Sequence, residues 1–214
     1  HRVDRRQRQM CIRDRRKDIL ERYAAGLLRN LEWWWSKRQL GDTGLLCFGT
    51  SLDAGDGLYK GTKLAAKDES TMDNSPLHDP VPFDEVSGLL LAADVGVNSM
   101  AALDGELLER IFNDLGELDT AQQLGERTVT HKQRIAEWLW DESRGIFANR
   151  MINGEFVNTL TPTSFFPMAA GIGSKDQFQR MIHSYLNNPS KFGGKFGLPS
   201  VTRDDPTYTD NVYW

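Results

Sequence analysis

The sequence has few of the residues that build covalent or metal-bound frameworks. Its 214 residues include only two cysteines, Cys11 and Cys47, which excludes a disulfide framework and is compatible with a reducing compartment. The four histidines match no zinc-ligand spacing, so we predict no metal and no cofactor. No run of 18 apolar residues occurs, so we predict no membrane-spanning segment and no membrane partner. These features favour a cytoplasmic location without fixing it.

The sequence also has little net charge, but that charge is unevenly distributed. The formal total is −4, of which residues 1–17 carry +6 and the remaining 197 residues carry −10. A basic head of this kind can bind nucleic acid through phosphates, or form a solvated tail. A third interpretation is that it is non-native, because the string RQRQMCIRDR resembles a translated sequencing adapter. We expect residues 1–16 to be non-native or disordered, and we predict no nucleic-acid partner.

Apolar residues recur at three- and four-residue intervals over most of the remaining chain, which predicts helices. The expected helices cover 17–39, 84–113, 118–139, 164–171 and 175–187. Residues 146–157 alternate around Asn153-Gly154, which predicts a small β-hairpin. Residues 41–80 are rich in Gly, Asp, Thr and Ser, and a loop of that length is usually functional. The pattern predicts an all-α fold and leaves a toroid, a repeat array and an irregular bundle open.

The long loop contains four carboxylates within twelve residues: Asp68, Glu69, Asp73 and Asp79. Cleavage of a glycosidic bond needs a carboxylic acid that stays protonated until it donates to the leaving oxygen. Neighbouring like charges and partial burial both raise the pKa of a carboxyl group, so a cluster of carboxylates can supply such an acid. The alternative is a solvated acidic loop whose Asp and Ser residues form turns and caps.

One segment of this loop is specific enough to suggest a family. Residues 69–76, Glu-Ser-Thr-Met-Asp-Asn-Ser-Pro, resemble the E-S-G-x-D-N-S-P signature of glycoside hydrolase family 63. Further resemblances follow in the same order along the chain, at 44–51, at 160–167 (LTPTSFFP), at 198–206, and at 210–214 (DNVYW), which is similar to the start of the family's Y-W-R-G motif.

This resemblance implies a fold, an activity and a set of site residues. The fold would be part of an (α/α)6 toroid of the six-hairpin glycosidase type, and the reaction would invert the anomeric centre of an α-glucoside or α-mannoside. Asp73 matches the general acid. Glu69 and Asn74 would line or brace the substrate pocket, and Tyr213 and Trp214 match aromatic residues that border the sugar. The implied partner is a carbohydrate.

The chain departs from the family pattern in two places and lacks one catalytic group. Thr71 stands where the signature most often has Gly, and Asp68 stands where some members have a sugar-contacting Trp. An inverting enzyme also needs a base about 6.5–9.5 Å from the acid, and the family's base lies downstream of the Y-W-R-G motif. We therefore expect 17–214 to be the N-terminal and central part of a catalytic domain truncated at its C-terminus, and inactive by itself.

Two other functions stay open at this point. A trehalase-like inverting hydrolase of the same toroid group also carries an acid in an E-S-G-x-D setting, although the Asn74-Ser75-Pro76 continuation argues against it. A non-catalytic helical scaffold that binds carbohydrate is compatible with the helix pattern. The sugar, the linkage, the general base and the oligomeric state are not indicated by the sequence.

Overall fold

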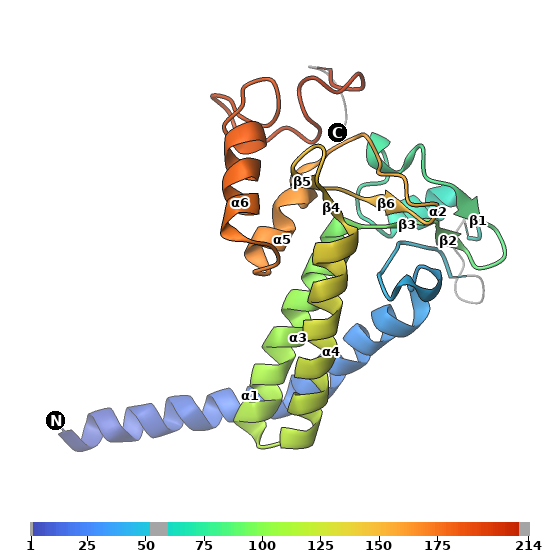
Figure 1. The fold of residues 1–214 in the computed structure, drawn as a ribbon. Helices are drawn as coiled ribbons and strands as arrows, with labels where there is room; N and C mark the ends of the chain where they lie inside the picture. Colours follow the sequence, from blue (N-terminus) through green and yellow to red (C-terminus); the bar gives the residue numbers. More distant parts are fainter. Residues whose placement is uncertain (1, 52–59, 210–214) are drawn as a thin grey trace.

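The computed structural model describes residues 2–51 and 60–209, with side chains from residue 17 onward, and is mostly helical (Figure 1). The long helices are α1 (Arg2–Lys37), α3 (Val95–Leu115) and α4 (Leu118–Trp138), and the shorter helices are η1 (Gly41–Thr43), α2 (Lys63–Asp68), η2 (Pro76–His78), η3 (Pro162–Phe165), α5 (Phe166–Ala169), α6 (Lys175–Met181) and η4 (Ile182–Leu186). The strands have two residues each: β1 (Phe83–Asp84), β2 (Leu89–Leu90), β3 (Ala92–Ala93), β4 (Trp140–Asp141), β5 (Ile146–Phe147) and β6 (Arg150–Met151).

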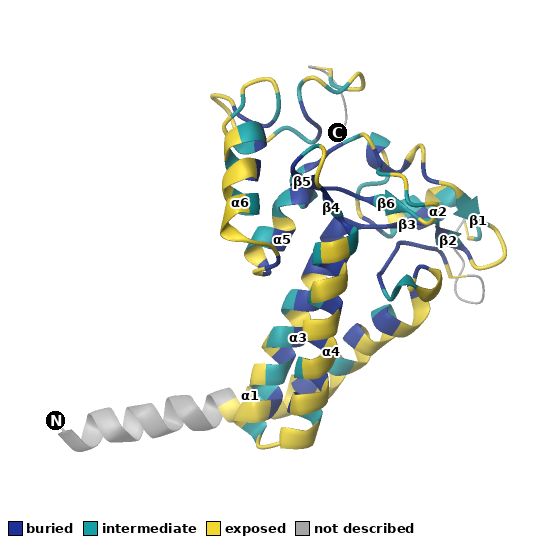
Figure 2. Ribbon diagram, viewed as in Figure 1, coloured by how far each residue is buried: buried dark blue, intermediate teal, exposed yellow. Residues whose placement is uncertain are grey.

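Helices α3 and α4 form an antiparallel hairpin whose facing sides are buried (Figure 2). The two helices approach closely at Gly105, where a Cβ atom would lie 2.2 Å from the Thr128 hydroxyl oxygen. The turn between them is made by Gly116, which ends α3 in the left-handed conformation at φ 84°. The expected helix at 118–139 is therefore confirmed.

Helix α1 packs against α3 through buried residues on one of its faces, among them Ala24, Leu31 and Trp35. The expected helix at 17–39 is confirmed as far as Lys37. Its backbone begins at Arg2 and includes the basic head. The side chains of residues 1–16 lie outside the described set, and the prediction for this head stays a prediction.

Strands, rather than a helix, occupy the segment before α3, so the expectation of a helix from residue 84 is wrong there. β1 and β2 pair antiparallel around a turn in which the Asp84 carboxylate accepts the backbone N–H groups of Val86 and Ser87. Gly88 has φ 71° in this turn. The carboxylate competes with helical hydrogen bonding, and α3 begins only after its own capping residue, Asp94.

The other two antiparallel pairs are β3 with β6, which joins residues 92–93 to 150–151, and β4 with β5. The expected turn at Asn153-Gly154 is confirmed, since Gly154 has φ 91° and Arg150 bridges Phe156 across it. The expected helices near 164–171 and 175–187 correspond to η3 with α5, and to α6 with η4. Ser174 begins α6 with a capping box.

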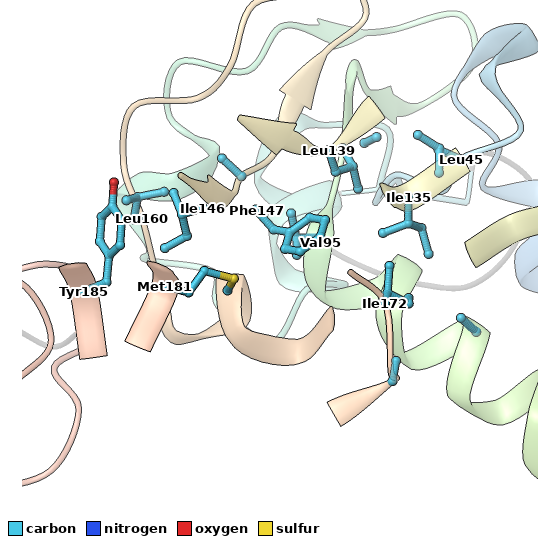
Figure 3. Packing of buried hydrophobic residues seen from close by; sticks show 14 of the residues in the cluster. Leu45, Val95, Ile135, Leu139, Ile146, Phe147, Leu160, Ile172, Met181 and Tyr185 are labelled. Atoms are coloured by element: carbon cyan, nitrogen blue, oxygen red, sulfur yellow. The ribbon is translucent and has the colours of Figure 1, made fainter. Parts of the chain in front are cut away.

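The main apolar core lies where the upper ends of α3 and α4 meet the small sheets and helices α5 and α6 (Figures 1 and 3). Ile135 of α4, Leu139 directly after that helix, Ile146 and Phe147 of β5 and Met181 of α6 are fully buried there. This core holds the loops on one side of the helical hairpin in place. Within the described residues, no helix has the length and apolar character needed to cross a membrane.

The buried His131 predicts how stability depends on pH. Burial lowers the pKa of His131 to about 4, against an ordinary value near 6.5, and the effects of the backbone of Gly44 and Asn98 oppose this only partly. Between these two values the unfolded chain binds a proton that the folded chain does not bind. His131 therefore reduces stability as pH falls from about 6.5 toward 4.

We expect His131→Phe to remove this dependence. The free energy of unfolding of the unmodified chain should fall by about 2 kcal/mol more than that of the variant between pH 7.5 and pH 5. Urea unfolding at the two pH values, followed by tryptophan fluorescence, measures both changes, and a stability offset common to both pH values cancels. Equal losses for the two chains would contradict the assignment of a neutral, buried imidazole.

Candidate active site

The acidic loop is a short turn between two capped helices. Thr62 caps α2, which ends at Asp68, and Ser75 caps η2. Asp73 is half-buried and Asn74 is exposed on the turn between these helices. The predicted acid and its neighbour therefore lie on a segment that is held at both ends.

Thr71 adopts the left-handed backbone conformation, although it stands where the family signature most often has glycine. Its φ is 59°, and no other non-glycine residue in the described ranges has a positive φ. The Ser70 hydroxyl fixes the turn by donating to the carbonyl of Lys67 at 2.6 Å and accepting the Met72 N–H at 3.0 Å. The loop thus keeps a backbone that suits glycine, with a β-branched residue in it, at a cost of about 1–2 kcal/mol.

Glu69 is bound on both carboxylate oxygens by groups of the protein. Arg38 donates from Nε to Oε2 at 2.7 Å and to Oε1 at 3.0 Å, and from Nη2 to Oε1 at 2.6 Å. The backbone N–H of Gly49 donates to Oε2 at 2.8 Å. A carboxylate has about four acceptor sites, so this geometry favours bracing over direct sugar binding, the two roles that the resemblance implied for Glu69.

A cleft of about 360 Å³ lies beside this loop, between α1, α3 and α5. Ser70, Thr71 and Met72, the residues directly before Asp73, form one wall. The other lining residues are mostly apolar and aromatic: Leu31, Trp34, Phe48, Gly96, Val97, Met100, Ala101, Thr163 and Phe166, with the carboxylates of Asp94 and Asp104. A mostly apolar hollow with a few polar groups is the usual form of a small-molecule site.

The three consecutive tryptophans of α1 have separate environments. Trp35 is buried in the helical core, where it meets His131 edge to face at 6.3 Å. Trp34 lines the cleft and contacts Phe48 edge to face at 6.1 Å. Trp33 is exposed, and the Cζ atom of the Arg38 guanidinium lies 4.6 Å from the centre of the Trp33 ring. One ring therefore packs in the core and one lines the cleft.

A buried polar network fixes the wall that α3 contributes. Asp94 caps α3 by accepting the Val97 N–H at 3.0 Å, and its second oxygen accepts the Asn149 amide at 2.7 Å. Asn98 exchanges two hydrogen bonds with the backbone of Leu46, at 2.8 Å and 2.7 Å. These bonds tie two distant segments, at residues 46 and 149, to the start of α3.

Two further titratable groups stand near the cleft. Asp104 lines its far end, and desolvation raises the pKa of its carboxyl above the ordinary value. His78 lies 2% exposed behind Phe48, with the two rings edge to face at 5.8 Å. Burial lowers the pKa of His78, although Asp94 acts in the opposite direction. Its imidazole is therefore neutral at pH 7.

Glu69, Asp73 and Asn74 flank the cleft-lining residues 70–72 on the same turn but do not line the cleft themselves, and Tyr213 and Trp214 lie outside the described residues. Sequence reasoning missed Arg38 and the network of Asp94, Asn98 and Asn149. Asp94 was detectable as an N-cap residue before an apolar helix. Arg38 had no local signal, because its partner is 31 residues away. Among the described residues, no group of three His, Cys, Asp or Glu side chains could hold a metal ion.

Comparisons with known proteins support the resemblance. The family model of the mannosylglycerate hydrolase MGH1-like glycoside hydrolase domain matches residues 3–214. Among curated relatives, a cytosolic neutral trehalase of Kluyveromyces lactis is 34% identical over 75 residues, which are 35% of this chain and 10% of the trehalase.

Solved structures agree on the fold. The family 63 mannosylglycerate hydrolase of Thermus thermophilus in complex with glucose superposes with a TM-score of 0.70 at 21% identity, over 94% of this chain and 52% of that one. The neutral trehalase of Saccharomyces cerevisiae superposes with a TM-score of 0.59 at 18% identity, over 86% and 41%. The predicted class, a mostly helical fold of the toroid glycosidase type, is confirmed. The chain spans about half or less of the length of these proteins.

The left-handed backbone at Thr71 predicts that glycine is the better residue there. Thr71→Gly should raise the free energy of unfolding by about 0.5–1 kcal/mol, because relief of the strain exceeds the entropy cost of glycine in the unfolded chain. Urea unfolding measures the change. Thr71→Ala is the matched control, since it removes the hydroxyl but keeps a Cβ atom, and it should gain less. A glycine variant less stable than the threonine chain would refute the assignment of strain.

Proposed function

The chain belongs to the mannosylglycerate hydrolase MGH1-like glycoside hydrolase family, and from this premise we propose what the whole protein does. It hydrolyses an α-glucosidic or α-mannosidic bond of a small glycoside or oligosaccharide, with inversion at the anomeric carbon. Asp73 is the general acid, which protonates the glycosidic oxygen as its bond to the anomeric carbon breaks.

The observation that carries this proposal is the placement of the signature loop. Residues 69–76 form a braced turn whose first half is a wall of the cleft, and Asp73 follows that wall directly. The ring of Trp34 and the carboxylates of Asp94 and Asp104 also line the cleft. A pyranose has an apolar C–H face and a rim of hydroxyl groups, so a cleft with an aromatic ring and a few polar groups suits a sugar.

The remaining site residues have supporting roles in the proposal. Asn74, exposed beside the acid, bonds a sugar hydroxyl, and Glu69 braces the loop through Arg38. Tyr213 and Trp214 border the sugar on the strength of the family resemblance alone. No cofactor enters the reaction.

We further propose that the general base lies outside these 214 residues, which are then inactive by themselves. The chain covers 52% of the mannosylglycerate hydrolase whose fold it shares. Two acidic side chains near the C-terminus already have structural partners, since Asp204 pairs with Lys191 and Asp205 accepts the Thr207 N–H at 2.9 Å. Neither has the free, cleft-facing carboxylate that water activation requires.

Trehalose hydrolysis is the second candidate, favoured by the 34% identity to a curated trehalase. The Asn74-Ser75-Pro76 continuation favours the first candidate, because it matches the family 63 signature. Mannosylglycerate, glucosylglycerate and α,α-trehalose compared in one assay of the complete protein separate the two. Turnover of trehalose alone would select the second candidate.

Asp73→Asn in the complete protein should lower kcat/KM for the best of these substrates by about 10²–10⁴-fold, the usual contribution of a general acid. The variant keeps the size of the side chain but cannot donate the proton of a carboxylic acid. Glucose or mannose release over time measures the rate, and circular dichroism checks the fold.

Asp68→Asn is the matched control, because Asp68 is an exposed carboxylate in the same loop with no role in the proposal. It should retain the activity of the unmodified protein within a factor of about three. An active Asp73→Asn variant would remove the acid from the proposal. Absence of turnover on every α-glycoside by the unmodified protein would leave a carbohydrate-binding scaffold as the better description.

A further inference from the structure

We propose that Arg38 is a positioning residue for Asp73, acting through Glu69, and this inference rests on the proposed function. Arg38 follows the last residue of α1 and is 5% exposed. It does not line the cleft, and within residues 69–76 its side chain contacts Glu69. Its influence on the reaction would therefore pass through the ion pair alone.

The ion pair has the geometry of a rigid clamp. The Nε and Nη2 atoms of Arg38 meet both oxygens of Glu69 at 2.6–3.0 Å, and the Arg38 Nη1 donates to the carbonyl of Lys37 at 3.1 Å. The Trp33 ring lies against the guanidinium. Two parallel bonds between planar groups fix orientation as well as distance, which the single ammonium of a lysine cannot do.

A second arm anchors Glu69 to the segment beneath it. The Gly49 N–H donates to Glu69 Oε2, and a Cβ atom at Gly49 would lie 2.6 Å from Leu89 Cδ2 and 2.8 Å from the Gly88 carbonyl oxygen. The Arg38 carbonyl in turn accepts the Cys47 N–H at 2.8 Å. Glu69 is thus joined to the end of α1 and to the buried segment 45–50, both of which belong to the packed body of the protein.

Stability alone does not account for such a pair. Removing two charges from water is costly, and apolar residues of similar volume often stabilise a buried position as well or better. The pair instead restricts where Glu69 can lie. We assign it to conformational specificity of the turn that follows.

The backbone between Glu69 and Asp73 has little conformational freedom. The Thr71 N–H donates to the Asp68 carbonyl at 2.9 Å, and the Ser75 N–H donates to the Met72 carbonyl at the same distance. Thr71 between them is held at φ 59°, a conformation that persists only where the surroundings over-determine it. Loosening Glu69 would let this strain relax and move Asp73 relative to the cleft.

Misplacement of a general acid has a specific chemical signature. A sugar or alkyl group leaves as an alkoxide and needs the proton, whereas 2,4-dinitrophenolate leaves without one. A merely structural defect lowers the rate for both leaving groups together. The ratio of the two rates therefore reports the position of the acid separately from folding or sugar binding.

The test compares kcat/KM of the complete protein for an alkyl and a 2,4-dinitrophenyl α-glycoside of the same sugar. For Arg38→Lys we expect about a 10²-fold loss on the alkyl substrate and less than about a threefold loss on the dinitrophenyl substrate. Asp73→Asn, measured in parallel, should show the same selectivity with a larger loss. Arg144→Lys is the matched control, because Arg144 also forms an ion pair, with Asp141 at 2.5 Å, and neither residue lines the cleft. The ratio of the two rates should not change in this variant.

Every outcome bears on the inference. Equal losses on both substrates, or no loss on either, would overturn it. If Arg38→Lys does not fold, Glu69→Gln replaces it as the test variant. The glutamine amide keeps the size of the side chain and an oxygen that accepts the Gly49 N–H, but it loses the charge. Equal losses on the two substrates in this variant would again overturn the inference. Selectivity in Asp73→Asn without selectivity in the Arg38 or Glu69 variants would remove only this inference, whereas no selectivity in Asp73→Asn would remove the proposed function itself.

Discussion

The contact between Arg38 and Glu69 joins the two parts of the molecule on which the candidate site depends. One part is the helical body, in which α1 lies across the α3–α4 hairpin and ends one residue before Arg38. The other part is the acidic turn, whose two ends pack through Ala66 and Leu77 in a small apolar cluster. Arg38 is 5% exposed and the Glu69 side chain 21% exposed, so their bidentate ion pair is largely shielded from solvent and salt and can orient Glu69 in addition to this packing.

A second set of polar contacts fixes the opposite wall of the cleft. Asp94, Asn98 and Asn149 are each at most 4% exposed, and their hydrogen bonds join the start of α3 to residue 46 and to the strand region after β5. A fully paired polar group in the interior restricts the chain to one arrangement, because any other arrangement leaves it unpaired. Both walls of the cleft are therefore defined by buried polar contacts, while apolar packing supplies the stability of the body behind them.

The sequence indicated the parts of this architecture that repeat locally. The apolar period of α1, α3 and α4 and the Asn153-Gly154 turn are both visible within a few residues. The pairs β1–β2, β3–β6 and β4–β5 were all missed, because two-residue strands have no period of their own. In addition, the apolar residues of 84–93 fit a helical spacing equally well. The clamp on Glu69 was missed for a different reason: its partners, Arg38 and Gly49, are 31 and 20 residues away. Thr71 shows the same limit, since only the backbone reveals that the left-handed position is kept without glycine.

The central claim is that the complete protein cleaves an α-glycosidic bond with inversion, and the anomer released first tests it most directly. Proton NMR of the complete protein acting on an α-glucoside or α-mannoside resolves the two anomers before mutarotation mixes them. The account predicts that the β anomer of the free sugar accumulates first. Initial accumulation of the α anomer would contradict it, because retention requires a nucleophile close to the acid and not a base with room for water between them.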